Sequence, residues 1–482
     1  MSHARAGIIL FAAGVLIAAI GAESGPAHSG PPGIYAITGA RLIARPGAVV
    51  EDATIVIRDG LIEAAGRGVT APADAFVIEA AGRTVTAGFI DACTDIGQKK
   101  AEAPAESGSP RPGPRETPPG PVHPIARVRA ERRAIDALIA DDAAFDKHRA
   151  LAFTSALTLP QGGVFRGQAA LINLGGGPPS RNIVTAQAGQ VIAFERGGFG
   201  QGYPTSLMGA IATVRQTLLD ARRHELWRTR YASDPAGLPR PDHVAAFEAL
   251  GPSASGGSRV IFDVTESADT ARALAVAAEF RLDAILIGSG FEHIERGALA
   301  ELRASGHPAI LPLAFPEKPK VDDPDAALGV SLRELERWDQ APAAPARFVE
   351  AGVPIALGTC RLSTAAEFPA RLRKAIGRGL SPDAALAALT SEPARMLGVD
   401  RIVGTVEAGK IANLVVFDGV PVGGEGIFSE KAKPVHVFVD GVKHDIEQKK
   451  SKGDPNARVD PRGTWSVTFS FGSRDVTRVW TI

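Results

Sequence analysis

The chain has 482 residues, 45% of them hydrophobic, so it is long enough to bury the core of one elaborated domain with a smaller satellite domain. Its 53 Lys and Arg residues equal its 53 Asp and Glu residues. Because neither sign of charge prevails, the composition offers no electrostatic attraction to nucleic acid or to an anionic membrane surface. We therefore expect a globular protein that does not bind nucleic acid.

The amino terminus has the pattern of a targeting segment. Arg5 precedes an uncharged stretch over residues 6–20, and the small residues Gly21 and Ala22 follow it. A membrane-spanning helix needs about 20 apolar residues, so this pattern favours a cleaved secretory signal over residues 1–22. We expect export to a bacterial periplasm or beyond, with no membrane attachment once the signal is cleaved. An uncleaved anchor is the alternative.

Residues 33–84 consist of short hydrophobic runs separated by turn residues, which predicts the strands of a small β domain. Asp59-Gly60 lies between two of these runs and predicts a tight hairpin turn. Farther along, residues 87–97 run Ala-Gly-Phe-Ile-Asp-Ala-Cys-Thr-Asp-Ile-Gly, a pattern typical of the end of a buried strand.

Residues 98–124 contain eight prolines and show no hydrophobic periodicity. This composition predicts an extended or disordered loop, for which a passive insertion is the simple interpretation and a lid or partner-docking loop the alternative. After the loop, the spacing of apolar residues predicts a helix over residues 127–140.

The longest motif lies near the carboxyl end, in residues 381–419. It contains Thr-Ser-Glu-Pro-Ala at 390–394, then Gly-Thr-Val-Glu-Ala-Gly-Lys at 404–410 and the strand-like run Leu-Val-Val-Phe. Together with the 87–97 segment, it resembles the imidazolonepropionase-like members of the amidohydrolase superfamily, over about residues 33–445.

The resemblance implies an α/β fold with a distorted (β/α)8 TIM-type barrel and a small β-sandwich built from both chain ends. The barrel should span residues 85–400, and the two parts of the sandwich should span residues 33–84 and 401–445. Residues 446–482 should form a linker and a carboxyl-terminal hairpin, because Trp465, Val467, Phe469 and Phe471 alternate with polar residues.

The resemblance also locates the family's metal ligands, and this chain departs from each of them. Cys93 and Asp95 stand where the family has a His-x-His pair at the end of the first barrel strand. Asn173 stands in place of a lysine that becomes carboxylated, Asp263 in place of a histidine after the fifth strand, and Cys360 in place of the aspartate after the eighth. His293, late after the sixth strand, is better explained by local packing than as a ligand.

A hydrolytic zinc site needs imidazoles and a carboxylate in fixed geometry, so we expect no cofactor, and zinc or another divalent metal only if the site still functions. Two functions remain open. The first is hydrolysis of a non-peptide C–N bond, such as that of a cyclic amide or imidazolone, with an unusual metal set or with Asp95 and Asp263 in acid-base roles. The second, which physical chemistry favours, is a non-catalytic periplasmic pseudoenzyme that binds a ligand or pairs with a sister amidohydrolase or with itself.

Cys93 and Cys360 are the only two cysteines. They end the expected first and eighth strands, which are neighbours about 4.8 Å apart in a closed barrel. An exported protein is therefore expected to join them in a disulfide. Free buried thiols, or a soft metal held together with Asp95 and Asp263, are the alternatives.

Overall fold

The computed structural model describes residues 33–99, 122–198, 202–447, 464–471 and 474–481. The expected signal over 1–22, and most of the proline-rich loop over 98–124, lie outside these residues. The chain divides into two compact units, residues 1–445 and residues 446–482, which we describe separately.

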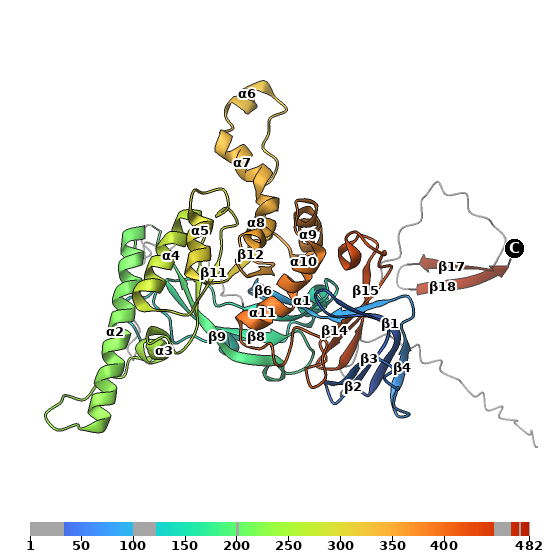
Figure 1. Ribbon diagram of the computed structural model, residues 1–482, viewed down its shortest axis with the longest axis horizontal. Helices are drawn as coiled ribbons and strands as arrows, with labels where there is room; N and C mark the ends of the chain where they lie inside the picture. The colour runs from blue at the N-terminus through green and yellow to red at the C-terminus, as the bar shows by residue number, and fades with distance from the viewer. Residues whose placement is uncertain (1–32, 100–121, 199–201, 448–463, 472–473, 482) are drawn as a thin grey trace, which may run out of the picture. The chain divides into compact units, whose positions relative to one another are not determined.

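Both ends of the first unit contribute to one eight-stranded sheet, as expected from the sequence (Figure 1). The last residues of the amino-terminal part pair antiparallel with the returning chain, so that Leu414 lies opposite Ala87. Hydrogen bonds connect all the strands into one sheet that bends around its own hydrophobic core, rather than into two separate sheets. Its strands are β1 (Tyr35–Arg45), β2 (Ala48–Arg58), β3 (Leu61–Arg67), β4 (Phe76–Glu79), β5 (Thr84–Ala87), β14 (Leu414–Asp418), β15 (Lys433–Val439) and β16 (Val442–Asp445).

The hairpin turn predicted at Asp59-Gly60 is confirmed. Strands β2 and β3 pair antiparallel, with Arg58 opposite Leu61. Asp59 and Gly60 have φ angles of 51° and 83°, the left-handed conformation that a two-residue hairpin turn requires. Glycine and aspartate adopt this conformation at lower cost than most other residues, which explains why the turn was visible in the sequence.

The second sheet is the nearly closed barrel, whose strands follow one another in chain order around it. Seven of the eight strands run parallel, and β8, the third in order, runs antiparallel to both of its neighbours. The strands are β6 (Phe89–Thr94), β7 (Phe153–Thr158), β8 (Phe165–Asn173), β9 (Ile183–Ala193), β10 (Val260–Asp263), β11 (Ala284–Ile287), β12 (Ala309–Pro312) and β13 (Ile355–Gly358).

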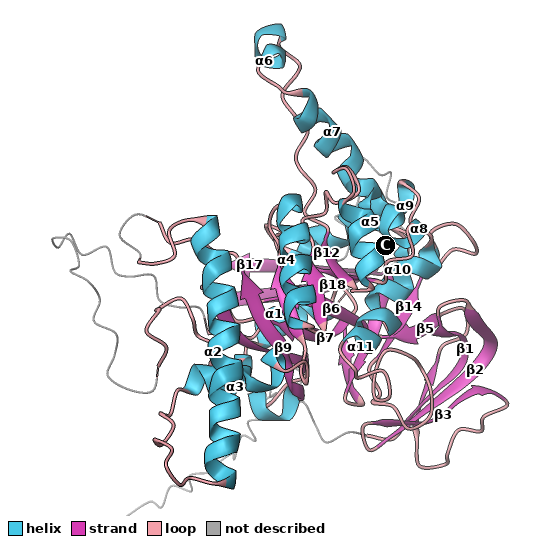
Figure 2. Ribbon diagram, turned by 60° about the vertical axis from the view of Figure 1, so that its left-hand side comes forward, coloured by secondary structure: helices cyan, strands magenta, loops and turns pink. Residues whose placement is uncertain are grey.

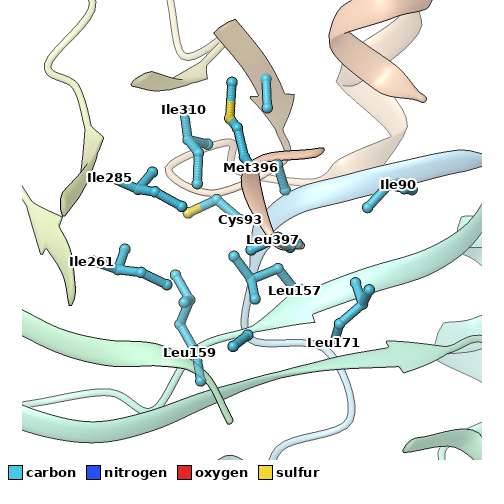
Figure 3. Packing of buried hydrophobic residues seen from close by; sticks show 14 of the residues in the cluster. Ile90, Cys93, Leu157, Leu159, Leu171, Ile261, Ile285, Ile310, Met396 and Leu397 are labelled. Atoms are coloured by element: carbon cyan, nitrogen blue, oxygen red, sulfur yellow. The ribbon is translucent and has the colours of Figure 1, made fainter. Parts of the chain in front are cut away.

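Inward-pointing aliphatic side chains fill the barrel. Figure 3 shows Ile261, Ile285 and Ile310 from successive strands packing toward Leu157 and Cys93. Helices lie outside the strands (Figure 2), as in other parallel barrels. They are α1 (Asp142–Arg149), α2 (Leu207–Ser233), α3 (Ala245–Ala254), α4 (Ser267–Phe280), α5 (Ala298–Ser305), α6 (Pro324–Leu328), α7 (Leu332–Gln340), α8 (Ala344–Glu350), α9 (Phe368–Gly377), α10 (Pro382–Leu389) and α11 (Ser391–Met396).

Within the described part of the chain, none of these helices is both long and apolar enough to span a bilayer.

The helix expected over residues 127–140 is wrong. Only a short 3-10 turn forms there, at Ala134–Ala137; Val128 and Arg133 form bridges to β8, and Leu138 forms a bridge to Gln98. The backbone N–H of Gln168 donates to the carbonyl of Arg132 at 2.8 Å. A Cβ at Gly167 would lie 2.4 Å from that carbonyl oxygen, so the glycine permits a close backbone approach that satisfies the segment's polar groups without a helix.

The barrel closes where β13 meets β6. The backbone N–H of Cys360 donates to the carbonyl of Cys93 at 2.8 Å, and a disulfide joins the two residues, whose Cα atoms are 5.3 Å apart. The carboxylate of Asp91, which is wholly buried, accepts hydrogen bonds from the backbone N–H and the hydroxyl of Thr359, at 2.9 and 2.5 Å. A Cβ at Gly358 would lie 2.7 Å from the backbone nitrogen of Cys93, so this seam requires a glycine.

The second unit contains an antiparallel hairpin made of β17 (Thr464–Phe471) and β18 (Arg474–Thr481), in which Trp465 lies opposite Trp480.

Removal of the disulfide should destabilise the protein. The bond links residues 267 positions apart, so it limits the conformational freedom of the unfolded chain. We expect the Cys93→Ala/Cys360→Ala double variant to lose at most about 5 kcal/mol of unfolding free energy in urea titrations. Alkylation of the unreduced mature protein should leave both cysteines unmodified, and mass spectrometry that finds two alkylated cysteines would contradict the bond.

Candidate functional site

A cavity of about 370 Å³ lies at the mouth of the barrel, beyond the carboxyl ends of β6, β10 and β13. Four of the five positions that replace metal ligands line it: Cys93, Asp95, Asp263 and Cys360. Their convergence follows from the barrel itself, because the carboxyl ends of parallel strands open on one face. The cavity therefore occupies the place where a barrel of this kind keeps its active site.

Asp263, at the end of β10, is held between two guanidinium groups. One carboxylate oxygen accepts from Arg166 Nη1 at 2.6 Å, and the other accepts from Arg361 Nη2 at 2.5 Å. Burial alone would raise the pKa of Asp263, but the two positive charges outweigh burial and hold the pKa below its ordinary value. Both oxygens of this carboxylate are thus engaged, and it is ionised at neutral pH.

The charged contacts continue across the mouth through Glu195. One of its oxygens lies 3.3 Å from Arg166 Nη2, and the other lies 2.5 Å from Arg127 Nη2. Arg127, Glu195, Arg166, Asp263 and Arg361 therefore form a row of alternating charges, which we call the mouth charge row. With three cations and two anions, the row by itself carries one net positive charge, and Asp95 adds a carboxylate to the same cavity.

Arg361 is fixed by its backbone and by its contacts. Its φ angle of 64° is in the left-handed region, which costs a non-glycine residue roughly 1–2 kcal/mol. Its guanidinium donates to the carbonyl of Gly288 at 2.9 Å and to the carbonyl of Val264 at 2.8 Å, in addition to its contact with Asp263. Such conformations persist where surrounding contacts determine them, and they are concentrated at functional sites.

Asn173, the remaining ligand position, does not line the mouth cavity. It ends β8, and since this strand runs antiparallel to its neighbours, its last residue lies at the opposite end of the barrel. Its Nδ2 donates to Asp440 at 2.7 Å, and its Oδ1 accepts from Asn413 at 2.8 Å. Asn173 therefore joins the barrel to the bent sheet. Burial raises the pKa of Asp440 there, although the hydrogen bond from Asn173 opposes the increase.

Two histidines near the barrel, His148 and His293, make local contacts within the protein. His148 of α1 lines the mouth cavity, where its Nε2 lies 3.6 Å from the buried carboxylate of Asp91 and its ring packs on Phe153. His293 donates from Nε2 to the carbonyl of Gln340 at 3.1 Å, which is the local role expected from the sequence. Burial lowers the pKa of His293, so it is neutral at pH 7.

The sequence analysis missed Arg166 and Arg361. Arg166 follows the buried Phe165 within a strand where arginine is unusual, and Arg361 directly follows Cys360. Both positions could have indicated a functional arginine. The sequence around them does not show which carboxylate each guanidinium group contacts. Both contacts span about a hundred residues of chain.

The residues at the mouth do not fit the divalent metal that this type of barrel commonly holds. The cysteine sulfurs are bonded to each other, and the carboxylate of Asp263 is paired with two guanidinium groups, whose positive charges oppose a metal cation at the same oxygens. Among the residues that the structure describes, no three His, Cys, Asp or Glu side chains are arranged to hold a metal ion. We therefore assign no step of chemistry to a metal at this site.

Comparison with known proteins shows which family and which solved structures the chain is similar to. Residues 339–443 match the model of the amidohydrolase family, while no curated protein sequence matches the chain. The structure of an amidohydrolase from Thermotoga maritima MSB8 is similar over 86% of this chain and 100% of its own, with a TM-score of 0.69 and 19% identity.

Two further structures share the fold at lower similarity. A Xaa-Pro dipeptidase with methionine bound in its active site covers 86% of this chain and 100% of its own, with a TM-score of 0.50 and 16% identity. Phenylurea hydrolase B covers 86% of this chain and 97% of its own, with a TM-score of 0.50 and 15% identity. The chain therefore shares the fold of these proteins over most of its length, and residues 339–443 match the amidohydrolase family.

Proposed function

We propose that this chain is a non-hydrolytic member of the superfamily, a pseudoenzyme that binds a small polar ligand at the barrel mouth. The observation that carries the proposal is the clamp of Arg166 and Arg361 on Asp263. Each oxygen of this carboxylate accepts a charge-assisted hydrogen bond from a guanidinium group, so a metal cation would have to compete with two positive charges for the same anion. The disulfide also prevents Cys93 and Cys360 from binding a metal as thiolates.

The same contacts argue against hydrolysis by the carboxylates alone. A general base works best when its pKa is near the operating pH, but the two arginines hold the pKa of Asp263 below the ordinary value of a carboxyl group. Asp95 is exposed at the edge of the cavity. Rapid hydrolysis of an amide requires that the activation free energy be lowered by many kcal/mol. Neither Asp95 nor Asp263 is placed to lower it by that amount.

The mouth nevertheless keeps the form of a binding site. Its volume suits a small metabolite, and Thr94, Ser363 and Thr364 line it together with Arg166 and Arg361. The segment 1–22 supports export to the periplasm, an oxidising compartment in which the disulfide is stable. We propose a second copy of the chain or a sister amidohydrolase as its protein partner.

Zinc binding tests the proposal. We expect the wild-type protein to bind zinc only weakly in calorimetric titrations. The Cys93→His/Asp95→His/Asp263→His/Cys360→Asp variant should bind at least about tenfold more tightly, because it restores imidazole and carboxylate ligands at converging positions. Adding Arg361→Gly should tighten binding further, since it removes a cation and glycine tolerates the left-handed backbone.

Asn173→Lys is the matched control for the zinc experiment. It also restores a family residue, but away from the mouth, so zinc affinity should not change. Stoichiometric zinc in the purified wild-type protein, or hydrolysis that zinc stimulates, would overturn the proposal that the chain is not a metal-dependent hydrolase.

Asp263→Asn should destabilise the protein in a pH-dependent way. At pH 7 the variant leaves two guanidinium groups without their carboxylate, which lowers the free energy of unfolding. Because the site is partly exposed to solvent, we expect the loss to be about 2 kcal/mol. The pKa of Asp263 is lower in the folded state, so its contribution is complete above the unfolded-state pKa of about 3.9 and decreases as pH falls below it.

Urea unfolding of wild type and variant at several pH values measures the difference. Asp95→Asn, at an exposed carboxylate in the same cavity, is the control and should change stability by less than about 0.5 kcal/mol at each pH. A difference for Asp263→Asn that stayed constant from pH 7 to pH 3 would contradict the assigned ion pairs.

A further inference from the structure

A second cavity, of about 380 Å³, lies at the other end of the barrel, where the strands begin. Phe89 at the start of β6 and Ala152 just before β7 form its inner wall. Helix α9 and the segment between β14 and β15 complete it, so barrel and bent sheet both contribute. Ligand cavities in proteins often lie at such junctions between domains. We call it the junction cavity.

Packed aromatic rings fix the inner wall of the junction cavity. The ring of Phe89 stacks on Phe428 with centroids 6.0 Å apart and lies 6.1 Å from Phe417. Phe368 and Leu372 of α9, each 2% exposed, close the wall from the helix side. Since these side chains are held by the surrounding core, the apolar wall is preformed and needs no rearrangement to receive a ligand.

Charged groups gather at the rim of the junction cavity. Arg373 Nη2 lies 3.4 Å from Glu430 Oε1, but the side chain of Glu430 is 81% exposed, so solvent weakens this pair. Lys433 is exposed at the start of β15, and the described part of the chain shows no ion pair for it. The charged rim, two cations and one anion, therefore has one net positive charge.

We propose that the junction cavity binds a small amphipathic carboxylate, with its apolar body among the phenylalanine rings and its carboxylate at Arg373 and Lys433. An ionised carboxylate forms charge-assisted hydrogen bonds with both cations and displaces Glu430 from its weak pair. A sugar would place hydroxyl groups without hydrogen-bond partners against the aromatic wall, which disfavours that class. The site is separate from the barrel mouth, so it does not depend on the function proposed there.

Calorimetric titration of the full-length mature protein with decanoate tests the proposal. We expect one binding site per chain, and we expect Lys433→Glu and Arg373→Glu each to weaken decanoate binding by about tenfold or more. Ala150→Trp, an exposed substitution at the edge of the cavity, should block entry and abolish binding. Decanol, with the same chain and no charge, should bind at least about tenfold more weakly than decanoate.

Lys431→Glu is the matched control, because Lys431 is exposed on the same segment but does not line the cavity. It makes the same charge change, so it should alter the affinity by less than about twofold. Unchanged melting temperatures show that the variants fold. Three outcomes would each overturn the proposal: no binding of decanoate to the wild type, equal binding of decanol, or equal weakening by Lys431→Glu and Lys433→Glu.

Discussion

The architecture depends on one seam, where the last barrel strand returns to the first. A buried carboxylate, Asp91, accepts two hydrogen bonds from Thr359 across this seam, and the disulfide lies two residues farther along β6. A wholly buried carboxylate is stable only when donors surround it, so Asp91 specifies the register of β6 against β13. With the register set, the residues beyond both strand ends are brought to one face, and the mouth cavity takes shape there.

The mouth charge row shows how guanidinium groups and carboxylates can connect the loops around a barrel opening. In a metal-dependent barrel, a cation draws together carboxylates and imidazoles from several strands. Here the mouth charge row connects the segments around the opening through guanidinium groups, and the disulfide adds a covalent link. A guanidinium group is positively charged and donates directional hydrogen bonds. It can therefore hold carboxylates from several segments together, as a metal cation does. Guanidinium groups supply no bound water of lowered pKa, which is the physical reason for proposing a binding role for this site.

The two cavities differ in a way that follows from their positions in the fold. The mouth cavity lies beyond strand ends, among polar loops, and its wall carries charges and hydroxyl groups. The junction cavity lies where the hydrophobic surfaces of two sheets meet, so its wall is aromatic and only its rim is charged. A barrel with an attached bent sheet therefore contains two chemically distinct cavities, at opposite ends of the same strands.

A local pattern was sufficient to predict the Asp59-Gly60 turn, whereas the barrel with its attached β domain and the four positions at the mouth were predicted from the resemblance to amidohydrolases. These features depend on nearest neighbours, or on strand ends that any parallel barrel brings together. The position of Asn173 depended instead on the direction of β8, and a hydrophobic run has the same pattern in either direction. The pairing of Arg166 and Arg361 with Asp263 was equally hidden, because contacts between side chains about a hundred residues apart exist only once the barrel has closed.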